Sequence, residues 1–232
     1  MMEKIKQRMG KKITVNSPVR KPRNLETMRA KILMVARRLF GKYGFHGTTT
    51  RMIAQEVGID VSTLYYHWGE KGNLYEAVVL DINDDLRKKL IDLETIIHGL
   101  PLAQRMGIAI DTVTDYLFEH PEITNVILCR FFMKIRHESS QNIHVPEYIS
   151  NIAFSMGLSK DKKVISVRHK MQVLTIMNAI YAFVSGEEFF RTSLGAKRNE
   201  YIALVKDTLK FILIPAFATP PGGGEGGFLR SI

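Results

Sequence analysis

The chain has 232 residues, of which 45% are hydrophobic and 24% are charged, and this composition is ordinary for one large or two modest folded domains. Its single cysteine excludes an intramolecular disulfide, and no spacing of cysteine and histidine is typical of a zinc site, so we expect no metal or cofactor. No apolar run approaches the roughly 18 residues of a membrane span, and the N-terminus lacks an apolar signal-peptide core. We therefore expect a cytoplasmic protein.

The positive charge lies in one part of the chain. The formal net charge is +10, and residues 1–71 hold this whole excess, with 15 Lys and Arg against 5 Asp and Glu. Residues 72–232 contain 18 basic and 18 acidic residues. Such an asymmetry is typical of a module that binds a polyanion and is joined to a neutral module.

Residues 1–24 form a basic segment that we expect to be a flexible arm. They contain eight Lys or Arg against one acidic residue, and Pro18 and Pro22 interrupt any long regular element. Such an arm could follow DNA phosphates or enter a minor groove. A tail without a specific role explains the same residues equally well.

The segment from about Leu25 to Tyr43 predicts a first helix, because its apolar residues recur at every third or fourth position. Gly41 and Gly44 mark its end. Three threonines at 48–50 then open a second helix, where one hydroxyl suffices for capping and the others are spare. The free N–H groups of such a helix start suit a phosphate.

Residues 50–68 predict two short helices that are joined by a tight turn. Ile53, Ala54 and Val57 form the apolar stripe of the first, and Gly58 follows where glycine most easily ends a helix. Asp60 then stands where a new helix needs an N-cap acceptor.

The second short helix, about 61–68, has two unlike faces. An apolar face would pack inward and the other face carries only hydrogen-bonding groups, so the pair predicts a helix-turn-helix that places this helix in the DNA major groove. The inward face holds Val61, Leu64, Tyr65 and Trp68, and the outward face holds Ser62, Thr63, Tyr66 and His67.

The rest of the chain predicts further helices and no strand of useful length. A helix over about 73–97 would link two domains, and helical patterns follow at about 102–118, 122–138 and 146–157. The segments 160–194 and 199–217 are apolar around most of a helical circumference, which indicates burial against the core and against a second subunit. We therefore expect a homodimer through these last two helical segments.

The stretch Gly58-Ile-Asp-Val-Ser-Thr-Leu-Tyr-Tyr-His-Trp68 resembles the signature of TetR-type transcriptional regulators, whose pattern is close to G-V-S-x-G-T-L-Y-x-H-F-x-x-K-x-x-L. The chain departs from that pattern at Asp60, Ser62 and Trp68. Ser62 adds a side chain to the face that would meet DNA. The matching residues are Gly58, Thr63, Leu64, Tyr65, His67, Lys71 and Leu74.

This resemblance implies an all-α fold with four parts. A basic flexible arm (1–24) precedes an N-terminal three-helix, helix-turn-helix DNA-binding domain (25–72), and a C-terminal helical domain for effector binding and dimerisation (73–218) precedes a flexible tail (219–232). The resemblance also assigns a set of residues to DNA binding, some to phosphates and some to base edges. They are Thr49, Thr50, Arg51, Ser62, Thr63, Tyr65, Tyr66, His67 and Lys71.

Regulators of this type usually hold a small, mostly apolar ligand in the C-terminal domain, so the resemblance also implies an effector pocket. Such a pocket needs a few polar groups in an apolar lining. A satisfied polar group in the core, or a group at the surface, explains each of these side chains more readily than ligand binding does. The candidates are Cys129, Arg130, Met133, His137, Asn178 and Tyr181.

The expected function is a homodimeric repressor that a small apolar ligand releases from a palindromic operator on double-stranded DNA. The alternative is a chromosome-organising or architectural DNA-binding protein of the same fold without a ligand. An enzyme is disfavoured because Cys129 has no evident catalytic partners and no nucleotide-binding loop appears.

Overall fold

The computed structural model describes residues 28–132, 147–159, 161 and 163–218. Every regular element in these ranges is a helix, which confirms the expected all-α fold; the arm and the tail predicted at the two ends lie outside the described residues. None of these helices is both long and apolar enough to cross a membrane. The helices are α2 (Met28–Gly47), α3 (Thr50–Val57), α4 (Val61–Trp68), α5 (Lys71–Ile97), α6 (Leu102–Glu119), α7 (Pro121–Phe132), α8 (Glu147–Ser155), α9 (Val167–Ser185), α10 (Glu187–Leu194) and α11 (Arg198–Ala218).

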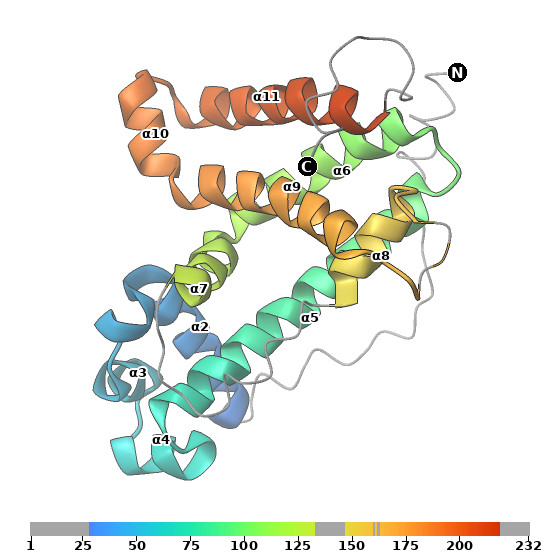
Figure 1. The fold of residues 1–232 in the computed structure, drawn as a ribbon. Helices are drawn as coiled ribbons and strands as arrows, with labels where there is room; N and C mark the ends of the chain where they lie inside the picture. The colour runs from blue at the N-terminus through green and yellow to red at the C-terminus, as the bar shows by residue number, and fades with distance from the viewer. Residues whose placement is uncertain (1–27, 133–146, 160, 162, 219–232) are drawn as a thin grey trace.

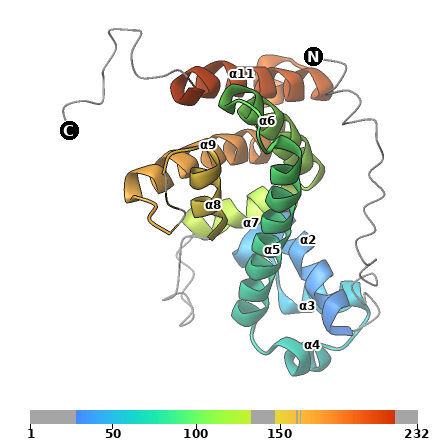
Figure 2. The same ribbon diagram turned by 90° about the vertical axis from the view of Figure 1, so that its right-hand side faces the viewer.

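The helices are arranged along one long connecting element, α5. Helices α2, α3 and α4 gather at one end of the molecule, and α5 leaves this end and runs toward α8 (Figure 1). Helix α11 packs along α6 at the opposite end, and α9 packs against α7 and α8. After a quarter turn, α4 and α11 still lie at opposite ends (Figure 2).

The two short helices cross closely because their contact residues are small or fully buried. Ala54 and Leu64 are 1% and 0% exposed, and both belong to one core that continues through α2 and α5. Gly58 ends α3 with φ 81° and ψ 38°, a left-handed conformation that glycine adopts without a Cβ clash. The predicted helix-turn-helix is therefore present.

One predicted cap is wrong. Asp60 stands at the N-cap position of α4, but its side chain accepts no hydrogen bond there. Thr49 does cap α3, since its hydroxyl accepts from the Met52 amide at 3.1 Å. Thr48 is buried, and its hydroxyl donates to carbonyls of α2.

The apolar segment 160–194 is not one continuous helix. Helix α9 begins at Val167, where the Ser166 hydroxyl accepts from the His169 amide at 3.2 Å, and it ends at Ser185 before Gly186 and α10. The expected helix over 122–138 is observed from Pro121 to Phe132, and its remaining residues lie outside the described ranges. Apolar periodicity alone did not predict where α9 begins and ends, because the N-cap at Ser166 and the turn at Gly186 determine these positions.

Candidate functional site

Helix α4 lies at one tip of the molecule (Figure 1), and its outer surface presents polar and aromatic side chains to solvent. Tyr66 is 86% exposed and Ser62 is exposed, whereas Thr63 and His67 are half-buried. The rings of Tyr66 and His67 meet edge to face, with centroids 5.3 Å apart. A short helix with this exposed face and a buried rear has the form that enters a DNA groove.

The start of α3 lies beside this surface and offers groups for a phosphate. Thr49 and Arg51 are exposed, and Thr50 is half-buried. Arg51 makes no ion pair with any described residue, unlike Arg38 of α2, which pairs with Glu56. A free guanidinium near a helix N-terminus suits a phosphate oxygen.

Tyr65 and Trp68, which the apolar stripe placed inward, are only partly buried. Tyr65 is 47% exposed, so the prediction that it packs inward is wrong. Trp68 is fixed by α2: its Nε1 donates to the Arg29 carbonyl at 3.2 Å, and the Arg29 guanidinium lies 4.2 Å from the ring centroid. Cation–π contact of this kind holds the end of α4 against α2.

Lys71 is half-buried and bonded within the protein. Its Nζ donates to the Phe45 carbonyl at 3.0 Å and to the Thr48 carbonyl at 3.1 Å, and lies 4.4 Å from the Phe45 ring centroid. Burial lowers the pKa of Lys71. These contacts hold the end of α2 and the loop before α3 in place. Lys71 therefore stabilises the DNA-binding surface to which the resemblance assigns it.

A cavity of about 710 Å³ lies in the C-terminal part, between α5, α6, α8 and α9. Its walls are mainly aliphatic and aromatic side chains, which is typical of a small-molecule site. Burial raises the pKa of Tyr148, which lines it, so this hydroxyl stays neutral. We call this space the C-terminal cavity; its apolar lining includes Leu90, Leu93, Ile97, Leu102, Met106, Ile110, Phe154, Met156, Val173, Met177 and Ile180.

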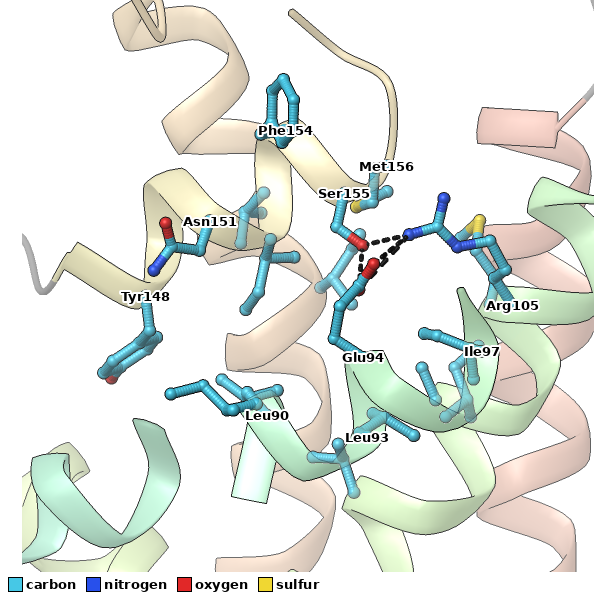
Figure 3. A pocket seen from close by; sticks show the side chains of 18 of the residues that line it. Leu90, Leu93, Glu94, Ile97, Arg105, Tyr148, Asn151, Phe154, Ser155 and Met156 are labelled. Atoms are coloured by element: carbon cyan, nitrogen blue, oxygen red, sulfur yellow. Dashed lines mark hydrogen bonds and ion pairs between the residues drawn. The ribbon is translucent and has the colours of Figure 1, made fainter. Parts of the chain in front are cut away.

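Polar groups lie on two sides of the C-terminal cavity (Figure 3). On one side, Arg105 Nη2 contacts Glu94 Oε1 and Oε2 at 3.1 and 3.3 Å and also bonds Ser155, whose hydroxyl donates to Glu94 at 2.6 Å. Tyr148 and Asn151 lie on the other side. The Asn151 Oδ1 is buried and has no hydrogen-bond partner.

The pocket residues chosen from the sequence lie elsewhere. Arg130 pairs with Glu76 at 2.6 Å and Cys129 precedes it on α7, while Asn178 is exposed on α9 and Tyr181 is buried. None of these four lines the C-terminal cavity. Their role in ligand binding stays a prediction, and Met133 and His137 lie outside the described residues.

The sequence did contain a signal for the missed polar groups. Arg105 interrupts the apolar stripe of α6, between Leu102 and Met106, and Glu94 interrupts that of α5, between Leu93 and Ile97. A charged residue within a buried stripe is costly unless it has a partner. Two such interruptions on consecutive helices indicate a polar cluster inside the domain.

This fold and site define a helix-turn-helix protein whose C-terminal helical domain holds an apolar cavity. Residues 32–78 match the model of the bacterial regulatory proteins of the tetR family. The segment from α2 to the start of α5 is thus a DNA-binding domain of the TetR type.

Relatives agree with this assignment. The chain is 30% identical over 110 residues to the HTH-type transcriptional repressor AcnR of Corynebacterium diphtheriae, covering 47% of this chain and 55% of AcnR. It is 30% identical over 90 residues to the HTH-type transcriptional regulator UidR of Escherichia coli K12, covering 39% of this chain and 44% of UidR. The matched region thus spans about half the length of these curated relatives.

Solved structures share the fold over more of the chain. The crystal structure of AibR in complex with isovaleryl coenzyme A and operator DNA has a TM-score of 0.59, and the likeness covers 82% of this chain and 99% of AibR. The sequence identity is 14%, so this likeness concerns the fold alone.

Proposed function

We propose that the protein is a homodimeric transcriptional repressor that a small, mostly apolar ligand releases from a palindromic operator. The observation that carries this proposal is the combination, in one chain, of an exposed α4 surface and a separate C-terminal cavity at the far part of α5. AibR, which shares the fold, was crystallised with both operator DNA and an acyl thioester of coenzyme A.

The DNA side of the proposal follows from surface chemistry. The exposed residues of α3 and α4, with Tyr66 and Arg51 foremost, are placed to contact base edges and phosphates. Phosphate contacts would supply much of the affinity, so binding should weaken steeply with salt. The basic residues 1–24 would add further phosphate contacts.

The dimer is supported by an apolar surface on the last helices. Leu204, Phe211 and Ile212 of α11 are 48%, 80% and 57% exposed and lie on one face at intervals of seven and eight residues. Met171 and Ala182 are exposed along α9. Large exposed side chains grouped in this way are typical of a subunit interface.

The C-terminal cavity favours a ligand-responsive regulator over the architectural alternative. A protein that only organises DNA needs no apolar space of about 710 Å³ in the domain remote from DNA, and a packed core would be more stable. The enzymatic alternative is set aside, because the family consists of regulatory proteins.

The DNA assignment can be tested by selecting duplexes from a random library with the full chain. We expect an enriched palindrome and a loss of affinity of at least about tenfold in Tyr66→Ala, the scale of one good base contact. Leu80→Ala is a matched control, because Leu80 is also exposed (68%) but lies on α5. Wild-type operator affinity in Tyr66→Ala together with Ser62→Ala would refute the assignment of α4.

The dimer can be tested separately by sedimentation. Phe211→Glu places a charge on the exposed face of α11 and should give a monomer with much weaker operator binding, since two half-sites must then be bound independently. A wild-type chain that sediments as a monomer at micromolar concentration would contradict the proposed interface.

A further inference from the structure

We propose that the C-terminal cavity binds amphipathic carboxylates, molecules with an apolar body and one anionic head, and that Arg105 holds the head. This inference rests on the proposed ligand-responsive function and specifies the chemical class of its ligand. Four features of the cavity carry it: an unused donor, an excess of positive charge, an apolar lining, and a carboxylate that already occupies part of the site.

The first feature is the hydrogen bonding of Arg105. A guanidinium has donors on each of its nitrogens and no acceptor. Arg105 uses Nη2 toward Glu94 and Ser155. Its Nε is buried without a partner. A buried donor without a partner is costly, and an acceptor oxygen of a head group would satisfy it.

The second feature is the charge of the lining. The formally charged residues of the wall are Arg87 and Arg105 against Glu94, so positive charge is in excess. Asp84, outside the wall, pairs with both Arg87 and Lys88, so including these two neighbours leaves the same excess of one positive charge. An anionic head is therefore favoured over a cationic one. Arginine binds carboxylates with two parallel hydrogen bonds, which neutral carbonyls cannot match in strength.

The third feature is the rest of the wall. Helices α5, α6, α8 and α9 all contribute aliphatic or aromatic side chains to the cavity, whose volume is about 710 Å³. A small inorganic or sugar-like anion would leave most of this surface in contact with water. A molecule with a bulky or long apolar body buries it and gains about 25 cal/mol for each Å² removed from water.

The fourth feature is Glu94, whose carboxylate already shows how a head group would lie. It accepts from Arg105 and from Ser155, and it is placed in the last turn of α5. A ligand carboxylate at Arg105 shares the guanidinium with Glu94 or replaces it. Either arrangement alters the contact between the end of α5 and helices α6 and α8, which is where a ligand signal would enter α5.

The proposal can be tested by calorimetric titration of the purified full chain in the absence of DNA. The probes are dodecanoate and cholate, a linear and a fused-ring carboxylate, each with its methyl ester as the uncharged match. We expect at least one acid to bind about tenfold or more tightly than its ester. Arg105→Met should weaken acid binding by about 10- to 100-fold and change ester binding by less than about threefold.

Two further variants make the test specific. Glu94→Gln removes the competing carboxylate and should tighten acid binding. Arg105→Met combined with Glu94→Gln removes both members of the Arg105–Glu94 pair, so it keeps the fold if the single variant does not, and it should bind acids no more tightly than esters. Arg168→Met is the matched control, because Arg168 is exposed on α9 and does not line the cavity.

The proposal is overturned if neither acid binds, if acid and ester bind equally, or if Arg105→Met weakens both alike. Because the titration contains no DNA, such a result leaves the operator assignment standing. Conversely, if the chain selects no operator but binds acids through Arg105, the proposed regulation is refuted and the proposed ligand class stands.

Discussion

Replacing Arg37 by Met should lower the free energy of unfolding by about 3 kcal/mol. Arg37 lies on α2, and its guanidinium contacts Asp81 at 2.9 Å and Asp85 at 2.5 Å on α5, and Glu122 at 3.4 Å on α7. Burial opposes its charge, but hydrogen bonds to Asp85 and Asp81 outweigh this and raise the pKa of Arg37. One cation thus holds together three helices.

The magnitude follows from what the substitution leaves behind. Removing one partner from a buried ion pair costs about 3–5 kcal/mol, because the remaining charge is buried and unpaired. The Arg37 side chain is 14% exposed, but Asp85 and Glu122 are 27% and 24% exposed, so water screens them in part and the lower end applies. At about 2–4 °C per kcal/mol for a chain of this size, the melting temperature should fall by about 6–12 °C.

The assay is thermal and urea unfolding, followed by circular dichroism at one protein concentration so that self-association contributes equally. Arg38→Met is the matched control. Arg38 is the next residue of α2, and its pair with Glu56 is exposed (55% and 41%), so its loss should cost less than about 1 kcal/mol.

Equal melting temperatures for the Arg37 and Arg38 variants would refute this reasoning. A large penalty that persists when the carboxylates facing Arg37 are also neutralised would contradict it too, since the loss would then come from packing of the side-chain stem. A further check is to add Asp81→Asn and Asp85→Asn to Arg37→Met, which should recover part of the stability by removing the unpaired charges.

Three smaller predictions concern other positions. Gly41→Ala should lower the free energy of unfolding by about 1–3 kcal/mol, because the added Cβ would lie 2.4 Å from the Cβ of Glu122. Gly107→Ala should be neutral or stabilising in the same unfolding assay, because no atom lies nearer than 3.8 Å to its added Cβ. Lys71→Met should cost about 1–2 kcal/mol and weaken operator binding, measured by anisotropy. Hydrogen bonds from Lys88 and Arg87 lower the pKa of Asp84 to about 2, so NMR titration should show this carboxyl protonating near that value, and its small stabilisation should be lost as the pH falls from the ordinary value of 3.8 through about 2.

The DNA-facing part of the fold was largely predictable from the sequence because its signals are local. Gly58 ends α3 and the apolar positions Ala54 and Leu64 meet at the crossing, as their spacing indicates. One prediction was wrong because the orientation of a side chain depends on distant residues: Tyr65 lies at the edge of the core and not within it. Lys71 donates to carbonyls at the end of α2 and just before α3, and its contact with DNA stays a prediction.

The C-terminal cavity was expected, but its lining was not. Its walls come from four helices that are far apart in sequence, and apolar periodicity shows which face of each helix is buried without showing where the buried faces leave a space. Polar residues near the C-terminal end of α7 were chosen for the pocket, yet Arg130 is paired with Glu76. The cavity is instead bounded by α8, whose position against α5 and α9 is set by long-range packing.

Three features that matter for the proposed function lie on α5. Lys71 begins it directly after α4, Asp81 and Asp85 bind Arg37 in its middle, and Glu94 meets Arg105 at the cavity. At 1.5 Å per residue, Lys71 and Glu94 are about 35 Å apart along the axis. Beyond its first turn α5 contains no glycine or proline, so a displacement at Glu94 is carried through the helix and not absorbed by a kink. The Arg37 cluster ties α2 to the middle of α5, so any tilt of α5 that the proposed ligand causes would act through this cluster on α2 as well as on α4.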